Sequence, residues 1–296
     1  MPTNSSISNE IDAIIARAMM EYQNAKGEDA FAPAETPIKE EPEEEEVFAP
    51  EIPVNSQSIL VAEETSRFSG AVWFENIKNT SVTLAGLGGI GSYVAFLLSR
   101  LHLNCLYLYD NDTVEAANMS GQLYSKQDVG ILKVNATCRT LENYSNFYDL
   151  VGFNERFTSS SPATEIMICG FDNMEARKTF FNSWKAFVVQ HPEEERKKCL
   201  FIDGRLAAEN FQVFCIRGDD NFNMNKYEDK FLFKDSEADE TICSYKQTSF
   251  MANMIASVMV NLFVNFCANE CNPLIPRDLP FFTEYSADTM FFKVIA

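Results

Sequence analysis

Four glycines lie close together where an apolar run of the chain gives way to a helical pattern. They form the pattern Gly-x-Gly-Gly-x-Gly and are Gly86, Gly88, Gly89 and Gly91. Because glycine has no Cβ, such a loop lets a phosphate approach the backbone. The N-terminus of the following helix offers free N–H groups and the positive end of its dipole. The pattern therefore favours nucleotide binding over the alternative, a tight turn with only a structural role.

A carboxylate lies where such a site needs one. Asp110 comes about 20 residues after Gly91 and directly follows the next apolar run, Cys105–Tyr109. An acidic side chain at the end of that strand can accept hydrogen bonds from ribose hydroxyls. The glycine loop and Asp110 by themselves suggest an enzyme that binds a dinucleotide.

The elements that position these residues follow α/β order. From Trp73 onward, short apolar runs alternate with longer helical patterns. We expect a Rossmann-like three-layer fold, with a mostly parallel sheet flanked by helices, over residues 67–296. The expected strands are Ser81–Ala85, Cys105–Tyr109, Glu165–Cys169, Leu200–Ile202 and Gln212–Ile216, with a turn around Gly204 before the last one. The expected helices are Ile90–Leu101, Lys133–Tyr144 and Glu175–Val188, and strand and loop are expected after Cys271.

The longest apolar stretch, Phe250–Phe266, has a polar residue at every fourth position. These residues are Asn253, Ser257, Asn261 and Asn265. A membrane-spanning helix needs about 20 predominantly apolar residues. The spacing therefore predicts a helix of a soluble domain with one polar stripe, and no membrane partner.

Four further motifs follow in order along the chain. They are Asp110-Asn111-Asp112, Asn118-Met119-Ser120-Gly121-Gln122, Asp128 to Lys133, and Gly170-Phe171-Asp172-Asn173. This series is foreign to dehydrogenases and resembles the ubiquitin-activating-enzyme-like (ThiF/MoeB) adenylyltransferase superfamily. The resemblance covers about residues 67–266 and is closest in style to stand-alone bacterial or phage members.

The resemblance implies ATP and Mg²⁺ as cofactors. Adenylation of a carboxylate releases pyrophosphate, so the site must hold a triphosphate and shield its charge. By family pattern, Lys133 contacts phosphate, Asp172 holds the metal, and Asp112, Asn118 and Gln122 line the nucleotide pocket with Asp110. The alternatives are that Lys133 is a solvated lysine and that Asp172 caps the following helix.

Three arginine positions matter to this resemblance. Arg67, in Arg67-Phe68-Ser69-Gly70, matches an N-terminal arginine that reaches the phosphates, often across a dimer interface, although it could equally be a surface residue. Arg177 matches a family position and is expected to bridge a helix and a strand. The family usually has arginine immediately before Gln122, whereas this chain has Gly121. That departure weakens ATP binding, moves the task to another cation, or marks a scaffold.

The cysteines allow a second chemical step. Cys243 precedes the apolar helix and looks like the cysteine that accepts the activated protein as a thioester in one branch of the family; a buried inert thiol is the alternative. Zinc-binding members carry two Cys-x-x-Cys pairs, which this sequence lacks, so no structural zinc is expected. Arg205 is expected to be structural, paired with Glu209 at i+4.

The acidic residues are concentrated at the N-terminus. The chain has 24 Lys and Arg against 43 Asp and Glu, a net charge of −19. Residues 1–66 are expected to be a mostly disordered arm with a short helix at 8–25 and a Pro- and Glu-rich linker at 31–60. Such charge makes nucleic acid an unfavourable partner. The N-terminus has no apolar signal segment, and the eight cysteines are therefore expected to be reduced thiols of a cytoplasmic protein.

The resemblance thus predicts an adenylyltransferase, expected to be a homodimer. Its substrate would be the C-terminal carboxylate of a small ubiquitin-like or sulfur-carrier protein. One alternative is adenylation of a small molecule or a tRNA base, as in the tRNA dehydratase branch. The other is a non-catalytic scaffold that keeps the fold.

Overall fold

The fold is known from a computed structural model, which describes residues 63–233 and 247–295. The expected helix at 8–25, the linker at 31–60 and Cys243 lie outside these residues.

Eight strands of the described chain form one sheet in the order β3-β2-β1-β4-β5-β6-β7-β8. The pairs from β3 to β5 are parallel, and those from β5 to β8 are antiparallel. The sheet confirms the expected α/β fold with a mostly parallel sheet between helices. The strands are β1 (Ser81–Ala85), β2 (Cys105–Tyr109), β3 (Leu150–Phe153), β4 (Ile166–Cys169), β5 (Leu200–Ala207), β6 (Asn210–Arg217), β7 (Phe282–Ser286) and β8 (Phe291–Ile295).

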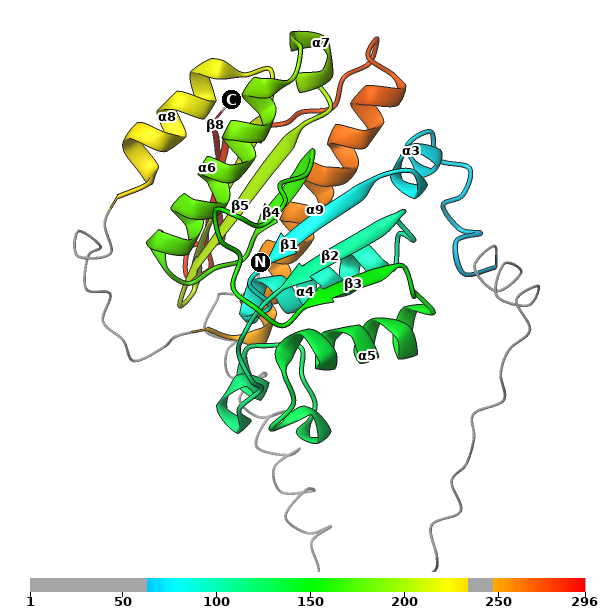
Figure 1. Cartoon of the computed structure of the whole chain (residues 1–296), viewed down its shortest axis with the longest axis vertical. Coiled ribbons are helices and arrows are strands. Elements are labelled where there is room, and N and C mark those ends of the chain that lie inside the picture. The colour runs from blue at the N-terminus through cyan, green and yellow to red at the C-terminus, as the bar shows by residue number, and fades with distance from the viewer. Residues whose placement is uncertain (1–62, 234–246, 296) are drawn as a thin grey trace, which may run out of the picture. The chain divides into compact units, whose positions relative to one another are not determined.

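Helices cover both faces of the sheet (Figure 1). One face carries α4 (Gly89–Ser99), α5 (Lys133–Ser145) and α9 (Ser249–Cys271), whereas the other carries α6 (Met174–Gln190) and α8 (Asn221–Phe231). Shorter helices are α3 (Phe74–Lys78) and α7 (Glu193–Arg196), with 3-10 turns η1 (Ala116–Ser120) and η2 (Lys126–Asp128).

The strand order indicates where a fold of this type binds its ligand. From β1 the chain runs outward through β2 to β3 and then returns to β4 on the other side of β1. At such a reversal the loops after the two central strands diverge, so the sheet opens at its carboxyl edge. The glycine loop follows β1 and Gly170 follows β4, so both belong to this edge.

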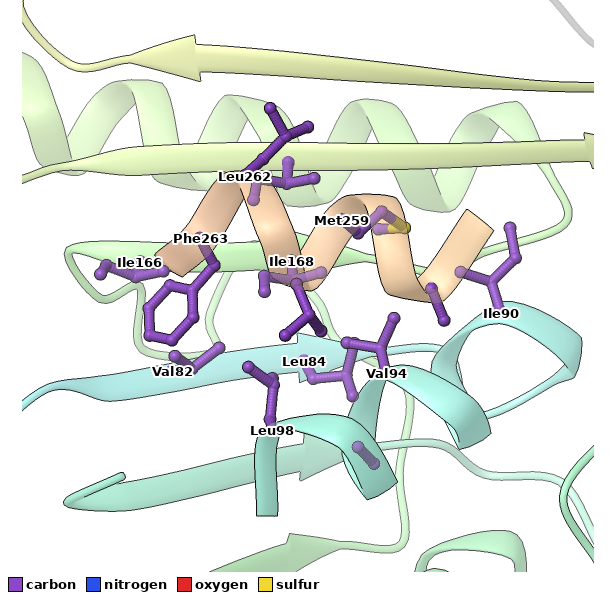
Figure 2. Close-up of a cluster of buried hydrophobic side chains, with 14 of the residues drawn as sticks. Val82, Leu84, Ile90, Val94, Leu98, Ile166, Ile168, Met259, Leu262 and Phe263 are labelled. Atoms are coloured by element: carbon purple, nitrogen blue, oxygen red, sulfur yellow. The ribbon is translucent and has the colours of Figure 1, made fainter. Parts of the chain in front are cut away.

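The core between β1, β4, α4 and α9 consists of interlocking aliphatic side chains (Figure 2). Its labelled members are Val82, Leu84, Ile90, Val94, Leu98, Ile166, Ile168, Met259, Leu262 and Phe263. Since each is at most 4% exposed, this layer fixes the start of α4 relative to the end of β1.

The long helix α9 is apolar and long enough to cross a membrane by length and composition. It nevertheless packs inside this domain, because Met251, Ile255 and Phe263 are fully buried against the sheet and α4. Its predicted polar stripe is confirmed: Asn253 and Ser257 are exposed.

The prediction of a turn at Gly204 was wrong. Gly204 lies inside β5, and the hairpin to β6 turns instead at Ala208 and Glu209, where Ala208 has a φ of 54°. The glycine has a packing role, because a Cβ there would come within 2.5 Å of Met259 Sδ on α9. Glycine signals a turn from sequence alone, but here it admits a helix against a strand.

Candidate nucleotide-binding site

The glycine loop brings three backbone segments into contact. Gly86 has a φ of +84°, and a Cβ there would lie 2.8 Å from the carbonyl carbon of Gly170. A Cβ on Gly91 would lie 1.7 Å from the oxygen of Gly86. These two glycines are therefore required by the close approach of β1, β4 and α4, whether or not a ligand is bound.

Asp110 is held by the same loop. Its carboxylate accepts hydrogen bonds from the Leu87 N–H at 2.7 Å and from the Asp112 N–H at 2.8 Å. Burial raises the pKa of Asp110, while these N–H groups and the ammonium of Lys133 act in the opposite direction. The side chain thus ties the end of β2 to the glycine loop, at the place predicted for a ribose-binding carboxylate.

Lys133 lies in the same cluster. Its Nζ is 3.0 Å from Asp112 Oδ2, and its backbone N–H donates to the Asp112 carbonyl at 2.9 Å. The residue is only 7% exposed at the start of α5. The alternative of a solvated lysine is therefore wrong, because the ammonium is buried and paired with the Asp112 carboxylate.

The polar residues between η1 and η2 have different roles. Asn118 Oδ1 accepts from the Glu115 N–H at 2.8 Å, so this side chain closes the 3-10 turn. Gln122 lies beside Gly88, with its Nε2 at 4.0 Å from the position of a Cβ there, and its Oε1 is buried with no partner among the described residues. Gln122 is thus available to a ligand, whereas the amide oxygen of Asn118 is engaged.

Tyr124 belongs to this cluster, and the sequence analysis missed it. Its hydroxyl donates to the Leu87 carbonyl at 2.6 Å and contacts Thr137 Oγ1 at 3.3 Å. Burial raises the pKa of Tyr124 well above its ordinary value, so the hydroxyl stays a donor. A tyrosine just beyond a polar motif carries no sequence signal of its own.

Asp172 follows β4 and is exposed at the carboxyl edge of the sheet. The alternative role as a helix cap is wrong, because Asn173 is the N-cap of α6 and its Oδ1 accepts from the Ala176 N–H at 2.8 Å. Asp172 Oδ1 accepts one hydrogen bond, from Asn173 Nδ2 at 3.2 Å. Its carboxylate therefore retains oxygens that a metal ion could use.

Arg67 is not brought to this cluster within the chain. It is exposed, and its neighbour Phe68 stacks on Trp73 and meets Phe74 of α3 edge to face. Helix α3 precedes β1, at the end of the sheet opposite the glycine loop (Figure 1).

A buried charge cluster supports the neighbouring strand end. Asp203 on β5 is fully buried, and both Arg177 of α6 and Arg205 are paired with it. Arg177 also donates to the carbonyls of Gly204 and Phe171, so its predicted bridging role is confirmed. The expected pairing of Arg205 with Glu209 was wrong, because Arg205 lies on a strand and its Nε donates to Asp203 Oδ2 at 2.8 Å.

The residues at this edge fit a nucleotide with a divalent cation. The backbone of Gly88 is open to a ligand, Gln122 has an unpartnered buried oxygen, and Lys133 supplies a cation. The described ranges contain no group of three or more His, Cys, Asp or Glu side chains placed so that they could hold a metal ion. Mg²⁺ is compatible with this, because it often uses one or two protein carboxylates together with substrate phosphates.

A comparison of the sequence with models of known protein families identifies the family of this chain. Residues 62–295 match the family model described as "ThiF family". The chain belongs to the ThiF family. Its members include adenylyltransferases of the ubiquitin-activating type, so the resemblance found in the motifs is confirmed.

Curated relatives of this ThiF-family chain are ubiquitin-like modifier-activating enzymes 5. The protein of Oryza sativa subsp. japonica is 35% identical over 35% of this chain and 29% of its own length. That of Drosophila mojavensis is 29% identical over 58% of this chain and 45% of its own length. The chain thus spans less than half the length of these two relatives.

Solved structures share the fold. PaaA superposes with a TM-score of 0.59 at 16% identity, covering 85% of this chain and 76% of PaaA. MccB of E. coli, solved with ATP, has a TM-score of 0.54 at 16% identity, covering 75% of this chain and 64% of MccB. MccB has also been solved with MccA.

Proposed function

We propose that this chain uses ATP to adenylate the C-terminal carboxylate of a small ubiquitin-like or sulfur-carrier protein. The observation that carries the proposal is the joining of the glycine loop, Asp110 and Lys133 at one sheet edge, in a chain of the ThiF family. The relatives named as ubiquitin-like modifier-activating enzymes support this class of substrate.

The residues divide the task between binding and charge. Asp110 accepts hydrogen bonds from the ribose hydroxyls. The N-terminus of α4 binds phosphate at Gly88, where the backbone is open. Lys133 neutralises phosphate charge while the substrate carboxylate attacks the α-phosphorus and pyrophosphate leaves. Asp172 would hold Mg²⁺ together with phosphate oxygens, and the cation would supply charge neutralisation for the leaving pyrophosphate.

A second step of this proposal is transfer of the activated acyl group to Cys243, which lies outside the described residues. Cys243 precedes Gln247 by four residues in the sequence, and Gln247 packs against Gly89 of the glycine loop. The thiolate would attack the acyl-adenylate, form a thioester and release AMP.

We also propose that the enzyme is a homodimer in which Arg67 serves the site of the partner subunit. Arg67 is exposed, and its neighbour Phe68 contacts Phe74 of α3, the helix at the end of β1 opposite the glycine loop (Figure 1). In this proposal Arg67 therefore reaches a nucleotide across the interface.

Titration calorimetry with ATP and Mg²⁺ tests the binding half of this proposal. We expect wild-type binding, and a loss of about tenfold or more in affinity for Lys133→Ala, since a charge-assisted contact to phosphate contributes about 1.5–3 kcal/mol. Lys126→Ala, in the exposed turn η2, is the matched control and should bind as wild type. Equal binding by wild type and Lys133→Ala would contradict the assignment of the site.

A non-catalytic scaffold remains the second candidate, favoured by one observation. Gly121 has no side chain to offer a phosphate, and the space beside it is filled by Gln247. The scaffold predicts that wild type binds no ATP and that a protein partner is retained with or without nucleotide. Exchange of labelled pyrophosphate into ATP in the presence of a carboxylate substrate would exclude it.

A further inference from the structure

The side chain of Gln247 occupies the face of the glycine loop at the start of α4. A Cβ on Gly89 would lie 2.0 Å from Gln247 Oε1 and 2.9 Å from its Cδ. A Cβ on Gly121 would lie 3.2 Å from both the Cβ and the carbonyl oxygen of Gln247. The glutamine therefore fits between two glycines that come from separate motifs of the chain.

The Oε1 atom of Gln247 lies against the first residue of α4. Gly89 is the first residue of α4, where the N–H groups of the first turn have no partner within the helix. A carbonyl oxygen carries partial negative charge and is favoured there for the same reason that a phosphate oxygen is. Since the amide is neutral, a phosphate of full charge interacts more strongly with the same helix end.

The side chain next to Gln247 lacks a hydrogen-bond partner among the described residues. Thr248 is the N-cap of α9, yet its hydroxyl makes no capping bond and is buried without a partner among the described residues. Threonine normally caps a helix through this oxygen. While Gln247 contacts the glycine loop, the Thr248 hydroxyl therefore does not cap α9. A different placement of these two residues could form the capping hydrogen bond.

We propose that Gln247 is an internal competitor of the nucleotide: its amide occupies the phosphate-binding face of Gly89 until ATP displaces it. The inference rests on the proposed function and adds a regulatory residue to that site. By filling the space beside Gly121, Gln247 lowers the apparent affinity for ATP in proportion to the time it occupies the loop.

Two substitutions with opposite expectations test the competition by titration calorimetry with ATP and Mg²⁺. Gln247→Ala removes the amide and should bind ATP about three- to tenfold more tightly than wild type. Gln247→Glu places a carboxylate at the helix end and should bind at least about tenfold more weakly. Gln190→Ala, on the exposed end of α6, is the control and should match wild type.

A second experiment examines the contact without any nucleotide. Gly89→Ala should lower the melting temperature in the wild-type background, because the new Cβ meets Gln247 Oε1. In the Gln247→Ala background the same substitution should lower the melting temperature much less. Gly91→Ala is the matched control, since its Cβ meets the backbone oxygen of Gly86 and should be equally damaging in both backgrounds.

The outcomes separate this inference from the proposed function. Weaker ATP binding by Gln247→Ala would overturn the competition and make Gln247 a ligand of the nucleotide, with the proposed function intact. Equal costs of Gly89→Ala in both backgrounds would overturn the contact. If wild type and Gln247→Ala both fail to bind ATP, the proposed function fails and the inference fails with it.

Discussion

Asp172 and Asn173 are adjacent residues with separate tasks. The Asn173 side chain caps α6, and Asp172 extends from the end of β4 into the carboxyl edge of the sheet. Lys133 and Asp112 also have separate tasks. Asp112 holds the Lys133 ammonium in an ion pair, at the place where phosphate would bind in the proposed function. Each of these side chains is held by a hydrogen bond or an ion pair, and each still has an oxygen atom or a charge that a ligand could contact.

Substitution of these two neighbours should separate stability from activity. Asn173→Ala loses the cap and should lower the free energy of unfolding by about 1 kcal/mol, with little change in pyrophosphate exchange. Asp172→Asn should leave stability near wild type and reduce the exchange rate by about 100-fold or more, since the proposed metal ligand loses its charge. Denaturant unfolding and the exchange assay measure the two effects. Exchange that survives in Asp172→Asn would remove this residue from the site.

Asp128 predicts a pH-dependent contribution to stability. Although burial favours its neutral form, the hydrogen bonds from Ser125 and the Arg139 guanidinium hold the pKa of Asp128 below its ordinary value. A carboxylate whose pKa is lowered by folding stabilises the folded state at pH values above its unfolded pKa of about 3.9. This stabilisation is lost as the pH falls through the pKa of the folded state. The free energy of unfolding of wild type should therefore exceed that of Asp128→Asn most at neutral pH. This difference should shrink below about pH 4. A constant difference from pH 7 to pH 2.5 in urea unfolding would contradict this.

At the scale of elements, the site depends on how α4, α6 and β5 are fixed to the sheet. Interlocking apolar side chains hold α4 between β1 and α9. Helix α6 is joined to β5 through the pairing of Arg177 with the buried Asp203. Although burial alone would raise it, Arg177 and Arg205 keep the pKa of Asp203 below its ordinary value, so the carboxylate stays ionised.

Removal of Arg177 should be severely destabilising. Arg177→Met keeps an apolar stem but leaves Asp203 with one cation fewer in the interior, and loss of one partner of a buried ion pair costs about 3–5 kcal/mol. Lys178→Met, at the next and exposed position of α6, is the matched control and should change stability by less than about 0.5 kcal/mol. Chemical denaturation measures both. The Tyr227 hydroxyl also donates to Asp203 Oδ2, at 2.8 Å. A mild effect of Arg177→Met would show that Arg205 and Tyr227 suffice to stabilise the Asp203 carboxylate.

At the scale of the whole molecule, the position of Arg67 decides whether one chain makes a complete site. The segment around Phe68 packs beside α3, at the end of β1 opposite the glycine loop. A homodimer with a two-fold axis could bring this segment of one subunit to the nucleotide of the other. The proposed dimer therefore predicts sites shared between subunits.

Mixing two inactive variants tests this sharing. Arg67→Ala and Lys133→Ala should each be inactive in pyrophosphate exchange. After subunit exchange, half of the dimers contain one site with both residues intact, so about a quarter of wild-type activity should return. Sedimentation should show dimers in every sample. Dimers that exchange subunits and stay inactive would place Arg67 in its own subunit's site or outside the mechanism.

Local sequence patterns determined the elements and the chemistry of the loop. Strands β1 and β2 were predicted with the observed bounds, because buried parallel strands are uniform apolar runs between polar or glycine-rich boundaries. The glycine loop and Asp110 were also predicted from spacing, and Lys133 was predicted from the family resemblance. Strand β3 was missed, since it is short and carries Gly152, and α8 was missed because it buries only Met224 and Tyr227.

Only the tertiary structure decided what depends on residues distant in the sequence. It placed Gly204 in a strand against Met259, paired Arg205 with Asp203, and set Gln247 against Gly89. It also separated Asp172 from the helix cap that spacing allowed. The sequence by itself determined which residues could bind a nucleotide, because backbone freedom and charge are local properties. Which of them meet was settled by packing, because contacts between distant segments leave no periodic signal in one chain.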